Sequence, residues 1–172
     1  MSECALALAA LFVLAGCTPV LDWREVRPEG SAARVLFPCR PASHARALRL
    51  GGDQVEMSMY SCAAGGTVYA LSFANIKDRT RVRDAVDDLA VAVQSHFQPV
   101  EAAASQPTVV RGMTPAGATT WRLAGRLRDG RPMQERTLLF SHGTHVYQAT
   151  MLGSSLDAEA QEMFFDALRV GS

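Results

Sequence analysis

The sequence predicts an α+β domain in which a twisted antiparallel sheet is flanked by helices. From residue 34 onward, several short segments alternate apolar and polar side chains, which is typical of strands. Turn signals at 51–53 and 129–130 separate neighbouring segments and favour hairpins, and hence antiparallel pairing. Two helical patterns each follow a run of strands, an order that favours α+β over α/β architecture. We therefore assign residues 34–172 to a single domain.

The domain begins with strands. Residues 34–37 form the first, and Pro38-Cys39-Arg40-Pro41 ends it as a corner, because proline has no N–H to donate to a ladder. Residues 45–50 alternate loosely and indicate a half-exposed strand. Residues 54–62 alternate regularly and predict a second strand, joined to the previous one by the turn at 51–53.

The segment 67–76 is a longer strand with apolar residues on both faces. Side chains two apart share a face. One face carries Tyr69, Leu71 and Phe73, and the other carries Val68, Ala70, Ser72 and Ala74. Burial on both sides predicts that helices cover the sheet above and below.

The clearest helix spans 78–97 and ends before Pro99. Its apolar residues recur at helical spacing, at Val82, Ala85, Val86, Leu89, Val93 and Phe97. Residues 101–107 are expected to be a loose connection.

The second half of the domain repeats the pattern of strands followed by a helix. The expected strands are 108–111, 118–128, 133–140 and 145–152, with a hairpin at Asp129-Gly130. Ser154 or Ser155 is expected to cap a last helix that runs to Leu168.

An apolar run at 5–13 precedes Leu14-Ala15-Gly16-Cys17. The run is shorter than the roughly 20 residues that span a bilayer, and small residues after such a run are typical of a cleaved signal. The four residues resemble the lipobox of bacterial lipoprotein precursors, which implies removal of residues 1–16 and lipidation of Cys17. The alternative is a buried core helix in a cytosolic protein. The residues before the run lack Lys and Arg, which indicates a weak signal or an upstream start.

The resemblance implies that a lipid anchor holds the protein on a membrane and that its domain faces the periplasm. Thr18 follows the expected lipidated residue, and by similarity to enterobacterial sorting it favours the outer membrane. Two or three acyl chains anchor stably where one does not. Residues 17–33 form the expected tether, whose prolines and glycine disfavour a continuous element. Trp23 is expected to dock on the domain.

Cys39 and Cys62 remain once Cys4 and Cys17 are assigned to the leader and the lipid. Two thiols in an oxidising compartment are most simply a disulfide, and closing a loop of this length stabilises by roughly 3 kcal/mol. A redox-active or metal-binding pair is the alternative, but the sequence has no Cys-x-x-Cys and no His at ligand spacing from either Cys.

Two segments resemble PsbP-like domains. They are the corner Phe37-Pro38-Cys39-Arg40-Pro41 and the ending from Val146-Tyr147-Gln148 to 164–170, where Ala167 and Leu168 depart from the family pattern. With the Cys39 and Cys62 pair, the chain is similar to short uncharacterised proteobacterial lipoproteins. The resemblance implies a PsbP-like α/β/α sandwich, a fold whose members mostly act as non-catalytic binding or assembly factors.

The candidate functional residues are few. Arg122, Arg126 and Arg128 alternate with apolar residues and predict a patch that meets an acidic partner, anionic lipid or polysaccharide; the alternative is a solvated strand face. His142 and His145 flank a turn and form the second candidate, a metal or catalytic pair, against the alternative of two solvated turn histidines.

We expect a lipid-anchored envelope protein with a non-catalytic, protein-binding or assembly role. No catalytic residue, cofactor or small-molecule substrate is evident. The formal net charge of +0 lacks the basic excess that nucleic-acid binding requires. Two alternatives stay open: a periplasmic enzyme or metal binder that uses His142 and His145, and a passive structural lipoprotein.

Overall fold

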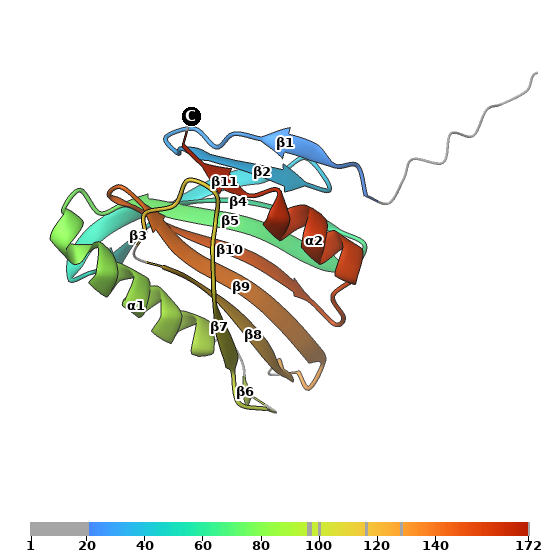
Figure 1. Ribbon diagram of the computed structural model, residues 1–172. Helices are drawn as coiled ribbons and strands as arrows, with labels where there is room; N and C mark the ends of the chain where they lie inside the picture. Colours follow the sequence, from blue (N-terminus) through green and yellow to red (C-terminus); the bar gives the residue numbers. More distant parts are fainter. Residues whose placement is uncertain (1–20, 96–97, 100, 116, 128, 172) are drawn as a thin grey trace, which may run out of the picture.

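The computed structural model describes residues 21–95, 98–99, 101–115, 117–127 and 129–171 (Figure 1). It is an α+β fold, a large antiparallel sheet flanked by helices, which confirms the predicted fold class. Among these residues no helix has the length and apolar character needed to cross a membrane.

The large sheet has eight strands in the order β3-β4-β5-β10-β9-β8-β6, with β7 also paired to β8. Their bounds are β3 Ala42–Leu50, β4 Asp53–Ala64, β5 Thr67–Asn75, β6 Gln98–Pro99, β7 Ala104–Thr108, β8 Ala118–Arg126, β9 Pro132–His142 and β10 His145–Gly153. Each named pair is antiparallel. Two meanders, β3–β4–β5 and β8–β9–β10, therefore join at the centre, where β5 pairs with β10.

A small second sheet lies over one face of the large one (Figure 1). It consists of β1 (Arg24–Val26), β2 (Ala33–Phe37) and β11 (Arg169–Val170). The expected tether is therefore not irregular throughout, because residues 24–26 pair with β2. Trp23 docks on the domain as predicted, edge-on to Tyr69 with ring centroids 5.9 Å apart.

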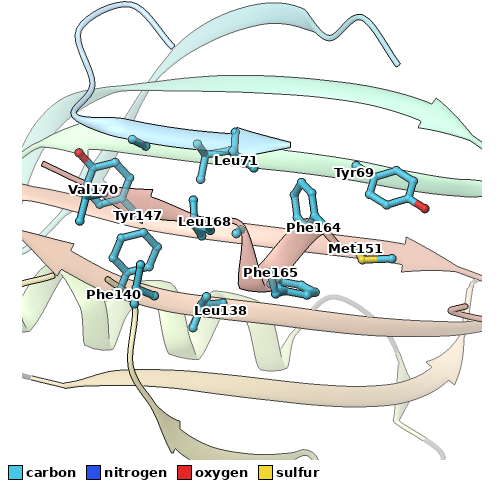
Figure 2. Close-up of a cluster of buried hydrophobic side chains, with 14 of the residues drawn as sticks. Tyr69, Leu71, Leu138, Phe140, Tyr147, Met151, Phe164, Phe165, Leu168 and Val170 are labelled. Carbon is cyan, nitrogen blue, oxygen red and sulfur yellow. The ribbon is translucent and has the colours of Figure 1, made fainter. Parts of the chain in front are cut away.

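An aromatic core fills the space between the large sheet and α2 (Ala158–Asp166). Figure 2 shows side chains from β5, β9, β10 and α2 gathered there. The Phe164 ring packs edge-on against Phe37 and Tyr69, at centroid distances of 5.6 and 5.5 Å. Phe140 stacks on Tyr147 at 4.8 Å. We refer to this side of the sheet as the α2 face.

An aliphatic core lies on the opposite side, the α1 face, under α1 (Val82–Gln94). Its buried members include Leu89 and Val93 of α1 and Ala74 of β5. Because Leu71 and Phe73 of β5 belong to the aromatic core, β5 is buried on both faces, as predicted.

Several expected element bounds are wrong. The strand expected at 108–111 lies earlier, as β7, and overlaps most of the expected loop at 101–107, because its exposed residues pair with β8 without an apolar pattern. The last helix was expected to run to Leu168 and ends at Asp166. The last helix is capped by Asp157, whose Oδ1 accepts the Ala160 N–H at 2.8 Å, and not by Ser154 or Ser155. The first helix starts with a 3-10 turn, η1 (Arg79–Arg81), and α1 ends at Gln94.

Candidate functional site

Two of the expected site residues, Cys17 and Arg128, lie outside the described residues. Cys39 and Cys62 lie at disulfide distance, with sulfur atoms 2.07 Å apart and Cα atoms 6.1 Å apart. Such a bridge ties the corner after β2 to β4, and Cys62 packs against the aromatic core. The pair therefore fastens the small sheet to the large one.

Arg122 and Arg126 lie on one face of β8 and both are exposed, as the alternation predicted. The register places Arg122 directly opposite Arg136 of β9. Arg136 was not expected as a site residue. Its guanidinium carbon lies 4.3 Å from the ring centroid of Phe165, so the three arginines belong to the α2 face. A two-residue turn at Asp129-Gly130 would place Thr137 opposite Arg122, whereas the observed pairs are centred on Asp129. The hairpin signal in the sequence therefore does not give this pairing.

The Arg136 side chain lies partly buried against α2. Its Nη1 donates to Gln161 Oε1 at 3.4 Å, and its Nε is buried with no hydrogen-bond partner among the described residues. Burial lowers the pKa of Arg136 and the positive Arg122 lowers it further, while Asp166 opposes both. Within the described chain, neither Arg122 nor Arg136 forms a salt bridge.

Two cavities meet at Arg136, and we call them together the arginine groove. The smaller, of about 380 Å³, is lined by residues that include Glu101, Arg122, Gln134, Leu156 and Gln161. The larger, of about 480 Å³, is lined by residues that include Thr108, Arg111, Thr120, Phe165 and Asp166. Each volume falls in the lower part of the range for ligand pockets, so each accommodates a side chain or a small acid.

His142 and His145 are cross-strand partners at the end of the β9–β10 hairpin. His142 Nδ1 donates to the Gly112 carbonyl oxygen at 2.7 Å. Burial lowers the pKa of His145, a backbone hydrogen bond with Gly30 opposes this shift, and His142 adds to it. Among the described residues, no three His, Cys, Asp or Glu side chains are placed to hold a metal ion. The histidine pair thus has no third ligand within this part of the chain.

The most voluminous of the cavities described, about 860 Å³, opens between β4 and the end of β5. Four exposed carboxylates line it, those of Glu29, Asp53, Glu56 and Asp78. Asp53 pairs with Arg81 at 2.8 Å, and Asp78 caps η1 through the Thr80 N–H. Two of its charges therefore have structural roles.

Comparisons with known proteins give the chain no family. No family model and no curated protein matches the chain. Among solved structures, the crystal structure of a Pseudomonas aeruginosa protein of unknown function is similar at 13% identity and a TM-score of 0.41. The match covers 81% of this chain and 88% of that chain. Similarity at this level supports no functional argument.

Proposed function

We propose that this chain is a lipid-anchored periplasmic envelope protein whose domain binds a protein partner and does not catalyse a reaction. The arginine groove is the observation that carries the binding role. It combines Arg122 and Arg136, which form no salt bridge with any described residue, with cavities large enough for side chains of another molecule. Cationic and aromatic groups beside a cavity are typical of surfaces where partners bind.

The proposed location is supported by the sequence and by the cysteine geometry. Leu14-Ala15-Gly16-Cys17 resembles a lipobox, and Thr18 after it favours the outer membrane. Cys39 and Cys62 lie at bonding distance, and disulfides persist in oxidising compartments such as the periplasm. The resemblance of the Phe37–Pro41 corner to PsbP-like domains supports a non-catalytic role.

The docked residues 21–23 limit the distance between the lipid attachment point and the domain. Leu21 and Trp23 pack against the aromatic core, and the Asp22 N–H donates to the Pro38 carbonyl oxygen at 2.8 Å. Cys17 lies four residues before Leu21, and four residues reach at most roughly 14 Å. With Cys17 lipidated, the domain is therefore held close to the bilayer, and a partner in or on the same membrane meets it readily.

The location is tested by mass spectrometry of the native protein from membranes. A chain that begins at an acylated Cys17 is expected, and Cys17→Ser is expected to release the protein from the outer-membrane fraction. An unacylated, uncut chain recovered from the soluble cytoplasm would overturn the location.

The binding role is tested by cross-linking in cells. A photo-reactive residue at Gln134 reports on the arginine groove, and one at the exposed Ala47 of β3 is the matched control. We expect a discrete cross-linked partner at Gln134 and none at Ala47. Background alone at both positions would contradict a protein-binding role and favour a passive structural lipoprotein.

A further inference from the structure

Among the described residues, neither Arg122 nor Arg136 forms a salt bridge, although Glu101 and Asp166 line the cavities beside them. Like charges directly opposite in a sheet destabilise the pair, and these two guanidiniums occupy opposite positions of β8 and β9. A buried donor without a partner also costs stability, and the Nε of Arg136 has no hydrogen-bond partner in the part of the chain that the structure describes. Both costs fall when an anion lies between the two side chains.

We propose that the arginine groove binds a carboxylate side chain from an acidic segment of a partner protein, held between Arg122 and Arg136. This proposal rests on the protein-binding function proposed above and names its chemistry. A guanidinium presents parallel N–H donors that match the two oxygens of a carboxylate. Gln134 and Gln161 line the same cavity and supply amide groups beside that position.

The groove's own acids favour a peptide over a polyanion. Glu101 lines the smaller cavity and Asp166 the larger one. Glu135 also lines the smaller cavity, although the register places its side chain on the opposite face with Leu123. An anionic membrane or polysaccharide brings negative charge onto these carboxylates too. A peptide places one carboxylate at the arginine pair and neutral or basic residues elsewhere.

The apolar walls support the same occupant. Leu156 borders the smaller cavity, and Phe165 and Leu168 border the larger one. The exposed Val109 lies at the rim of the larger cavity. Apolar contacts beside a charged anchor suit a peptide, whose neighbouring side chains cover them and exclude water from the ion pair. A free phosphate offers no such cover.

The test measures binding of a labelled peptide that alternates Glu and Ala to the purified full chain, by fluorescence anisotropy. The same peptide with Gln in place of Glu is the ligand control. Because Arg122 is exposed, the Arg122→Gln variant is expected to fold. We expect Arg122→Gln to weaken binding about tenfold or more, the loss of one charge-assisted hydrogen-bonded contact. Arg122→Lys keeps the positive charge but lacks the paired N–H donors of a guanidinium, so its affinity for the peptide is expected to lie between those of wild type and Arg122→Gln.

Arg46→Gln is the matched control variant, since it removes one exposed arginine from β3 on the other face of the sheet. It is expected to bind as wild type does. Arg136→Gln is expected to weaken binding at least as much as Arg122→Gln, with circular dichroism to show that the domain stays folded.

Three results would overturn the carboxylate site: no binding that depends on Arg122, equal binding of the Gln peptide, or Arg122-dependent binding only of inorganic phosphate or phosphatidylglycerol vesicles. Its failure is separable from that of the proposed function. A partner that is still cross-linked in cells with Arg122→Gln contradicts the carboxylate site and leaves a protein-binding role in place.

Discussion

The two faces of the large sheet are covered in different ways. The α1 face is covered by one helix of 13 residues that contributes an aliphatic stripe. The α2 face is covered by a helix of nine residues and by a separate small sheet, over a core of stacked and edge-on aromatic rings. A helix of nine residues is marginal alone, so its stability comes from packing.

The α2 face also contains the contacts that join segments far apart in the sequence. Trp23 docks there, β11 pairs with β2, and the Cys39–Cys62 pair joins the corner to β4. The candidate binding groove lies on the same face, and α2 serves both, because Phe164 enters the core while its neighbour Phe165 lies under Arg136. Substitutions in the aromatic core should therefore weaken binding at the arginine groove, and substitutions in the aliphatic core of the α1 face should not.

The largest expected effect comes from Phe164→Ala. Phe164 is 0% exposed and contacts Phe37 and Tyr69, so the change is expected to cost about 3–5 kcal/mol of the free energy of unfolding. Leu89→Ala, at 4% exposure on the α1 face, is expected to cost about 2–4 kcal/mol. Urea denaturation measures both.

If the aromatic core of the α2 face dominates stability, Phe164→Ala must lower the free energy of unfolding more than Leu89→Ala does. Met163→Ala is the control, since Met163 lies beside Phe164 on α2 but is 37% exposed, and its loss should have little effect. Peptide binding to folded protein should weaken in the Phe164 variant and not in the Leu89 variant. A larger loss at Leu89 would contradict the view that the aromatic face dominates stability.

The elements best predicted from the sequence are those in which burial determines where the apolar residues lie. Strand 54–62 lies within β4 and was predicted from its alternating side chains, and strand 67–76 is close to β5 and was predicted from apolar residues on both of its faces. The sequence pattern misses β7 and β1, which are short, mostly exposed strands that pair through backbone groups and need no apolar face. The expected capping serines fail for another reason: Asp157 is a competing cap residue nearer the helix.

The candidate site was only partly predictable. Arg122 and Arg126 stand out because they alternate with apolar residues on β8. Arg136 does not, because its neighbours Glu135 and Thr137 are polar and yet buried, where the Thr137 hydroxyl donates to Glu135. Arg136 is therefore identified by the register observed in the structure and not by composition, and Arg111 enters the groove only through tertiary folding.

The next effect concerns the cysteine pair of the α2 face. Replacing Cys39 and Cys62 together by Ser is expected to cost roughly 3 kcal/mol and to lower the melting temperature by several degrees. The residues are 23 apart in sequence, so the bridge restricts a loop of moderate length in the unfolded chain. Reductant should lower the melting temperature of wild type and leave the double variant unchanged. Equal melting of wild type with and without reductant would exclude the bridge as a stabiliser.

A smaller effect tests how α2 begins. Asp157→Ala removes the acceptor of the Ala160 N–H and is expected to cost about 1 kcal/mol. Ser154→Ala and Ser155→Ala are matched controls, because both residues are exposed and precede the helix without capping it. Denaturation that is more sensitive to either serine than to Asp157 would restore the sequence-based assignment of the cap.

The smallest effect is a pH dependence located on the α2 face, where His145 stacks near Tyr147 at a centroid distance of 6.2 Å. Burial lowers the pKa of His145 in the folded state below its ordinary value of 6.5. The unfolded chain therefore takes up the proton first, and stability falls as the pH drops through about 6.5 toward the lower folded pKa. His145→Gln should flatten this part of the stability profile. His142→Gln should flatten it partly, because the His142 charge contributes to the shift. Profiles of wild type and His145→Gln that stay parallel between pH 7 and 5 would show that another group titrates there.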